Sequence, residues 1–207
     1  VGPGQCTHGT VQAAIDAAAA SAGPDTIRMT QATYMAQRLV VNDTSDLSIE
    51  GGFLGCTATT HANTSTLDGQ GANPPGPVIR HLGTSRLTLS DLIIRNGVAV
   101  GANATSTLGG GVSSTGTGAI TVQRSLIHSN RASNGGGMAA LGSFGSLKEV
   151  NLISVGFNSN QALINGGGLH ASQSDIQISG ESSYFAGNHA DGTDNGGGGA
   201  LFALGCN

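Results

Sequence analysis

The sequence predicts an all-β fold, a parallel β-helix (β-solenoid) with a short N-terminal capping α-helix. Three observations lead to this prediction. One alanine-rich segment with helical spacing is followed by many short strand-like runs. A unit that ends in an apolar-x-x-Asn pattern then recurs about every 30 residues, which is a period typical of solenoids. A run of three glycines accompanies the repeat and stands before a small or apolar residue.

The composition fits a strand-rich, weakly charged protein. Charged residues make up 10% of the 207 residues and glycine supplies 35 of them, whereas an average domain has about 25% charged residues and about 7% glycine. Hydrophobic residues make up 38%, so the chain has enough apolar surface to build a core. The net charge is −4 and Lys148 is the one lysine. The lack of a basic cluster excludes nucleic acid as a partner.

The segment from Thr10 to Gly23 is the one predicted helix. Alanine dominates it, and Val11, Ile15 and Ala18 fall on one face at helical spacing. The first coil of a solenoid exposes its core at the open end and needs a cap. We therefore expect the alanine-rich face of residues 11–22 to cover that opening.

The rest of the chain is read as coils of a single domain, residues 1–207. Within it, residues 1–25 form the N-terminal cap, 26–86 the first coils and 87–207 the repeat coils. Short β-branched or leucine-rich runs bounded by Gly, Asn, Asp or Pro mark the strands. In order, the first of these runs are DTIRM, RLVV, LSIEGG, STLDG, PVIRHL and RLTLSDLIIRN.

The asparagines of the repeat are predicted to form corners of successive coils. They are Asn96, Asn130, Asn160 and Asn188. Asparagine tolerates the left-handed conformation of a sharp turn, and stacked asparagines can hydrogen-bond to one another as a ladder. The large apolar residue three positions before each one should form a column in the core, with parallel strands about 4.8 Å apart. These apolar residues are Ile93, Ile127, Phe157 and Phe185.

The alternative fold, an antiparallel sandwich of unrelated strands, does not explain why the apolar-x-x-Asn pattern and the glycine runs recur together.

The glycine runs are predicted to be the points where a solvent-exposed loop re-enters the coil. Gly136, Gly167 and Gly197 represent three of these runs. Glycine there allows a positive φ and a close approach of the neighbouring coil. The residue after each run should turn inward, and these residues are Val112, Met138, Leu169 and Ala200.

The three cysteines suggest one disulfide. A Cys6–Cys56 bridge would close a loop of about 50 residues and stabilise the fold by roughly 4 kcal/mol. Cys206 is then left over. Three buried free thiols are the alternative.

The repeat resembles the passenger domains of polymorphic outer membrane proteins, which are bacterial autotransporters that combine GGA-aliphatic and FxxN motifs. The likeness covers residues 87–204, although Gly replaces Ala in most copies and Ile replaces Phe in two. The N-terminal part is similar to the opening of pectin-lyase-like β-helices. These resemblances imply a right-handed β-helix that is secreted or lies on the outer-membrane surface. They do not decide the activity, because one fold hosts many functions.

Candidate catalytic and metal-binding groups are sparse in the sequence. The acidic residues are spread along the chain, and Asp91 is expected to pair with Arg124, which we place one residue out of line with it. The paired aspartates and the Gln-containing motifs of pectin esterases are absent. Asp191, Asp194 and Asn195 lie in a loop with calcium-ligand chemistry but without the spacing of known calcium loops. We predict no catalytic residue, metal or cofactor.

Two functions follow from these observations. The first is a non-catalytic surface protein, an adhesin or autotransporter passenger that binds a carbohydrate or a host cell-surface ligand. The second is an extracellular carbohydrate-active enzyme, a polysaccharide lyase or esterase, with its site in a variable loop such as residues 97–108. We expect no transmembrane segment, because no apolar run approaches the length that spans a bilayer.

The C-terminal end of the sequence shows no polar cap after its last apolar run. We expect that the chain is a fragment of a longer protein or that a partner covers this end.

Overall fold

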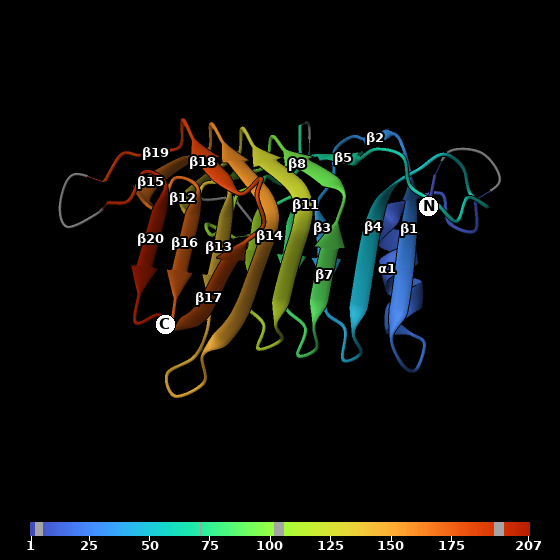
Figure 1. The fold of residues 1–207 in the computed structure, drawn as a ribbon, viewed down its shortest axis with the longest axis horizontal. Coiled ribbons are helices and arrows are strands. Elements are labelled where there is room, and N and C mark those ends of the chain that lie inside the picture. The colour runs from blue at the N-terminus through green and yellow to red at the C-terminus, as the bar shows by residue number, and fades with distance from the viewer. Residues whose placement is uncertain (3–5, 71, 102–105, 193–196) are drawn as a thin grey trace.

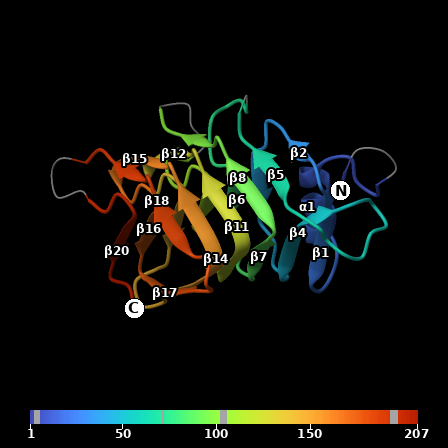
Figure 2. The same cartoon turned by 45° about the horizontal axis from the view of Figure 1, so that its top comes forward.

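The computed structural model describes residues 1–2, 6–70, 72–101, 106–192 and 197–207. It confirms the predicted fold class, a right-handed parallel β-helix with a helical cap. Figure 1 shows the coils stacked along the long axis of the molecule, with the N-terminal helix at one end and the last strands at the other. The same stacking is visible after a rotation in Figure 2.

The largest sheet has ten strands and covers two faces of the solenoid. Its strands are β1 (Asp25–Thr30), β2 (Thr33–Tyr34), β4 (Leu47–Phe53), β5 (Ser65–Asp68), β7 (Leu87–Ser90), β8 (Leu92–Arg95), β11 (Ile120–His128), β14 (Lys148–Asn158), β17 (Ser174–Ser179) and β18 (Tyr184–Ala186). The long strands β11 and β14 run through both faces. In the neighbouring coils two shorter strands take the place of one long strand, β7 and β8 beside β11 and β17 and β18 beside β14.

Two smaller sheets close the coils. The six-stranded sheet contains β3 (Leu39–Val41), β6 (Ile79–His81), β10 (Val112–Ser114), β13 (Met138–Leu141), β16 (Leu169–Ser172) and β20 (Leu201–Leu204). The four-stranded sheet contains β9 (Val98–Ala99), β12 (Arg131–Asn134), β15 (Gln161–Asn165) and β19 (His189–Ala190). Neighbouring named strands pair in parallel in all three sheets.

The helix α1 (Val11–Ala19) covers the first coil, against β1 and β3. The Thr10 side chain caps its start by accepting a hydrogen bond from the Ala13 N–H. Its buried residues include Val11 and Ile15, which the helical spacing placed on one face. The helix ends before the predicted Gly23. The Ala20 N–H donates to the Ala17 carbonyl, three residues back, which closes the last turn of the helix. A Cys6–Cys56 disulfide joins the segment before this cap to the segment after β4, as predicted.

Inward-facing side chains stack in columns through the coils. In one column Leu47, Leu87, Ile120 and Val150 lie level with one another. All four are almost completely buried. Each coil therefore buries its apolar face against the coils on either side, as expected for a solenoid.

The predicted column before the asparagines is wrong in its first member. Ile127, Phe157 and Phe185 pair as expected, and the two phenylalanine rings stack 4.7 Å apart. In the preceding coil, however, Ile94 pairs with Ile127, whereas Ile93 is only partly buried. The spacing from the column to the turn is the same in both coils, but the asparagine of this coil lies at the turn itself, one position earlier than Asn130, so counting back three residues from Asn96 gives the wrong residue.

Asparagines form a hydrogen-bonded ladder over three coils. The Asn130 Nδ2 donates to Asn160 Oδ1 at 3.0 Å, and the Asn160 Nδ2 donates to Asn188 Oδ1 at 2.9 Å. The backbone N–H groups of Asn130 and Asn160 donate to the same two oxygens. In the coil before, the Gly97 N–H donates to Asn130 Oδ1, so Gly97 occupies the ladder position and Asn96 does not.

The left-handed corner and the ladder are two different positions. Ser129 and Ser159, which precede the ladder asparagines, have positive φ angles of 55° and 53°. Asn96 has a φ of 58° and lies at this corner position itself. The prediction combined the two roles in one residue, whereas the later coils assign them to consecutive residues.

Different glycines of each run have different structural roles. The first glycine of three runs, at 109, 135 and 166, adopts a φ between 60° and 66°. In the last run the third glycine, Gly198, has the corresponding φ of 68°. In the first three runs the next two glycines lie against the neighbouring coil. A Cβ added at Gly136 would lie 2.4 Å from the Gln161 carbonyl oxygen, and one at Gly167 would lie 2.4 Å from the Gly199 carbonyl oxygen.

The last glycine run departs from the prediction. Leu201 pairs with Leu169, so it takes the inward position predicted for Ala200. The Gly199 carbonyl accepts a hydrogen bond from the Gly168 N–H, whereas a Cβ at Gly197 would meet no described atom within 4 Å. In this longer run the close-approach position therefore lies two residues later than predicted, at Gly199, and the inward residue lies one residue later, at Leu201.

We predict that Gly136→Val destabilises the fold by about 3 kcal/mol, because the added side chain would overlap the backbone of the next coil. The melting temperature should fall by about 6–12 °C in thermal unfolding followed by circular dichroism. Gly55→Val is the matched control, since a Cβ there meets nothing within 4 Å. Equal melting temperatures for the two variants would contradict the close-approach interpretation.

Candidate functional site

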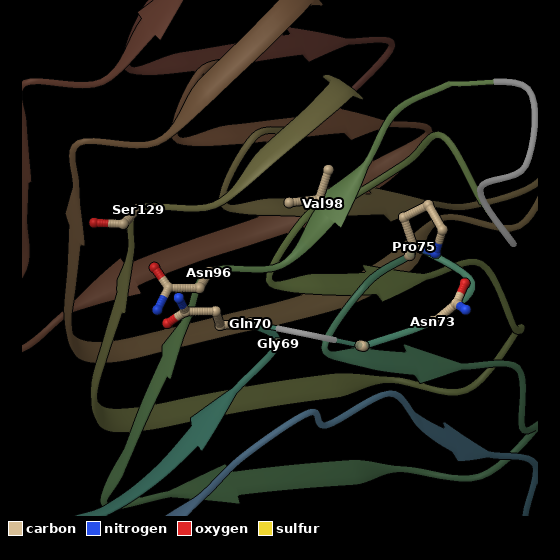
Figure 3. Close-up of a pocket in the computed structure, with 9 residues that line it drawn as sticks. Gly69, Gln70, Asn73, Pro75, Asn96, Val98 and Ser129 are labelled. Carbon is tan, nitrogen blue, oxygen red and sulfur yellow. The ribbon is translucent and has the colours of Figure 1, made fainter.

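An open pocket of about 650 Å³ lies at the corner where the four-stranded sheet meets the largest sheet, and we call it the corner pocket. Figure 3 shows that residues from three successive coils contribute to it. Amide side chains of Gln70, Asn73 and Asn96 and the hydroxyl of Ser129 lie around it. Its apolar lining comes from Ala72, Pro75 and Val98. The corner pocket thus combines an apolar surface with hydrogen-bonding groups that carry no charge.

A buried carboxylate fixes one wall of the corner pocket. Asp68 is 1% exposed, and its Oδ1 accepts hydrogen bonds from the Gln70 N–H and the Asn96 Nδ2, both at 2.9 Å. Its Oδ2 accepts from the Arg95 Nε at 2.8 Å. Burial raises the pKa of Asp68, but the hydrogen bonds from Gln70, Asn96 and Arg95 outweigh burial, so the pKa is lowered overall. The ionised Asp68 therefore holds Asn96 and the backbone of Gln70 in place.

The composition of the corner pocket suits a carbohydrate. Ligand pockets are usually concave and largely apolar, with a few polar groups that fix orientation. Amides and hydroxyls can both donate to and accept from sugar hydroxyls, and the apolar lining can contact the C–H faces of a sugar ring. The Gln70 side chain is exposed and no described residue hydrogen-bonds to it, so it is available to a ligand.

A second groove of about 510 Å³ lies on the outer surface of the largest sheet, and we call it the Arg124 groove. Besides Arg124, its lining includes the Ser125, Ser154 and Ser182 side chains. Tyr184 closes one side, with its ring against Gly156, where a Cβ would lie 2.6 Å from the ring. Hydroxyl groups, a guanidinium and an aromatic ring are therefore close together.

The predicted Asp91–Arg124 ion pair is confirmed. The Arg124 Nε and one terminal nitrogen donate to the two Asp91 oxygens at 2.9 and 2.7 Å. The Asp91 hydrogen bond raises the pKa of Arg124, more than burial lowers it. The expected offset is wrong, because Gln123 pairs with Ser90 and this register places Arg124 level with Asp91. The His61 Nδ1 lies 3.9 Å from the same carboxylate.

Asp91 and Arg124 both adopt positive φ angles, 56° and 45°. A non-glycine residue in this region costs roughly 1–3 kcal/mol, and such strain clusters at functional sites. Here the strain occurs at a coil corner, where the two side chains point outward and can pair.

A buried polar cluster lies inside the coils at the start of β14. Lys148 is 2% exposed, and its ammonium group donates to the carbonyl oxygens of Gly116 and Gly118. The buried His81 Nδ1 is 2.9 Å from Ser114 Oγ. Burial lowers the pKa of Lys148 to about 8, and burial together with the Lys148 charge lowers that of His81 to about 4. Neither Lys148 nor His81 lines the corner pocket or the Arg124 groove.

Sequence reasoning missed this cluster, although a signal for it was present. Lys148, Val150 and Leu152 are alternate residues of β14, and all three point inward. The period-two pattern of a strand therefore assigned the lysine to the core. Its charge argued for the surface, and charged residues are rarely buried without a partner.

The remaining predicted groups stay apart. Asp191 pairs with His189 and Gln161, while Asp194 and Asn195 of the calcium hypothesis lie outside the described residues. Four residues of the variable loop 97–108, 102–105, also lie outside them. Among the residues that the structure describes, no group of three or more His, Cys, Asp and Glu residues has a metal-binding arrangement.

Comparisons of the chain with protein-family models, curated proteins and solved structures find no match. In the described part of the chain, no helix has the length and apolar character required to cross a bilayer.

We predict that stability falls with pH between about 6.5 and 4 because of His81. The pKa of His81 is lowered on folding, so the unfolded chain binds the extra proton first and stability is lost as the pH falls through this window. The loss should approach about 3 kcal/mol. Urea unfolding at several pH values measures it.

His81→Gln should flatten the dependence of stability on pH in this window, and His8→Gln, at a partly buried position whose side chain hydrogen-bonds to no described residue, should leave it unchanged. An equally steep dependence in His81→Gln would show that His81 is not responsible.

Proposed function

We propose that the chain is a non-catalytic extracellular or cell-surface β-helix that binds carbohydrate through its side wall. The corner pocket carries the proposal, because it offers three amides, a hydroxyl and an apolar lining on a scaffold held by the buried Asp68. A solenoid keeps such a pocket rigid, since each coil is held by its two neighbours.

Two further observations support the extracellular part of the proposal. The Cys6–Cys56 disulfide fits an oxidising compartment. The Gly-Gly-apolar and apolar-x-x-Asn repeats resemble those of autotransporter passengers, and the early strands resemble pectin-lyase-like proteins. Both families act outside the cytoplasm, so the resemblance favours an adhesin-like protein at the cell surface.

We predict that Gln70→Ala weakens carbohydrate binding about five- to tenfold, since loss of its hydrogen bonding to a sugar costs about 1–1.5 kcal/mol. The protein is first applied to a printed array of neutral and uronic-acid oligosaccharides, and the best-retained sugar is then titrated by calorimetry. The melting temperature should not change, because the Gln70 side chain is exposed.

Gln177→Ala, on β17 and away from the corner pocket, is the matched control for binding. The proposal fails if the array retains no protein, or if Gln70→Ala binds the titrated sugar as well as the control does.

A specific observation also favours a second function, an extracellular carbohydrate-active enzyme. The Arg124 groove contains an arginine paired with a carboxylate, next to hydroxyl groups and a tyrosine. A polysaccharide lyase requires a basic group near the carbon that loses its proton and a group that stabilises the resulting charge. Arg124 and Asp91, with His61 close by, have suitable chemistry for an acidic polysaccharide.

The two functions are separated by an assay on pectin and alginate that follows the ultraviolet absorbance of unsaturated products. The enzyme proposal predicts turnover that falls at least about a hundredfold in Arg124→Gln. Gln70→Ala is the control and should retain full turnover. Turnover of this kind would contradict the non-catalytic proposal, and its complete absence in the wild-type protein on both polymers would contradict the lyase.

A further inference from the structure

The C-terminal end of the solenoid exposes residues whose counterparts are buried one coil earlier. Ile178 is 42% exposed, whereas Leu152, with which it pairs, is 0% exposed. Leu201 is 36% exposed, whereas its partner Leu169 is 0% exposed. Figure 1 shows β17, β18 and β20 at this end, opposite α1. We call the surface formed by β17, β18, β19 and β20 the end face.

The asparagine ladder stops at the end face with hydrogen bonds unmade. The Asn130 and Asn160 backbone N–H groups each donate to the Oδ1 of the asparagine in the next coil. No described residue accepts from the backbone N–H of Asn188. Its Nδ2 donates to the Phe157 carbonyl and to no described asparagine. The missing acceptor has the position and chemistry of one more asparagine Oδ1.

The chain has already begun the next layer. The Asn207 N–H donates to the Ser174 carbonyl, and the Ile176 N–H donates to the Asn207 carbonyl, both at 3.1 Å. This is the hydrogen-bond pattern of a parallel strand with Asn207 level with Asp175. Asp175 itself pairs with Glu149 in the coil before, so Asn207 continues an existing row of the largest sheet.

We propose that the end face receives one more coil of the same repeat, in register with the row that Asn207 continues. The coil places an asparagine over Asn188, a large apolar residue over Phe185 and an aliphatic residue over Leu201. The ladder and the parallel edges select this occupant, because an unrelated apolar surface would leave the Asn188 N–H without an acceptor. A second copy cannot stack head to tail on this face, since α1 covers its first coil.

The test extends the full chain with a copy of its own residues 150–175 after Asn207. The copy continues the register of Asn207 and carries the equivalent of Asn160 to the position over Asn188. Thermal unfolding should show a melting temperature about 5 °C or more above that of the original chain, because an added coil contributes one further interface. The copied segment should also resist subtilisin.

Two matched controls make the result specific. A scrambled copy of the same composition should be digested rapidly and leave the melting temperature unchanged. A copy with alanine in place of its ladder asparagine should lie between the two, because it buries the apolar column but leaves Asn188 unpartnered. The proposal is overturned if the native-order copy is digested as quickly as the scrambled one.

The oligomeric state tests whether a second copy of the chain covers the end face instead. We expect the original chain to be a monomer in light scattering. A stable dimer that Leu201→Asp dissociates would assign the end face to a second copy and would also overturn the proposal.

Discussion

The left-handed corner is the constraint on which the rest of this structure depends. A coil closes only where the backbone turns sharply, and it stacks only if every neighbour turns at the same level. The corners therefore form columns of residues with positive φ. One column consists of Asp91, Arg124, Ser154 and Gly180, and another of Asn96, Ser129, Ser159 and Gly187. Between the corners, short parallel strands keep their register because each is held at both ends.

Both candidate sites result from these corners. Asp91 and Arg124 are consecutive members of one column, which brings their side chains together at the surface although 33 residues separate them. Asn96 is the first member of the other column, and its side chain borders the corner pocket. A solenoid thus positions functional groups through its turns more than through its strands, whose inward positions are occupied by the core.

The sequence predicted the architecture because the corners leave a periodic trace of Asn and Gly. It predicted the local register less well. An asparagine one position earlier, at Asn96, makes Ile94 the column residue in place of Ile93, and the longer last glycine run moves the close contact from Gly197 to Gly199. The pattern of residue types hides differences of one or two residues, because neighbouring residues in these segments have similar chemistry.

The candidate sites were still harder to predict. The Asp91–Arg124 pair was visible because opposite charges recur at nearly the repeat distance. The corner pocket was not, since Gln70 and Asn73 come from a loop that precedes the repeat coils. Lys148 was missed for the opposite reason: its place in the strand was clear, but two backbone carbonyls rather than an acid compensate its burial.

The Cys6–Cys56 bridge makes the two ends of the solenoid unequal in stability. It joins the segment before α1 to the segment after β4, so the covalent link and the cap hold the same end of the stack. In a nearly one-dimensional array, coils detach from whichever end is held least. We therefore expect thermal fraying of these coils to begin at β20 and to move toward α1. The bridged end should stay folded longest, while the coils are lost one at a time from the opposite end.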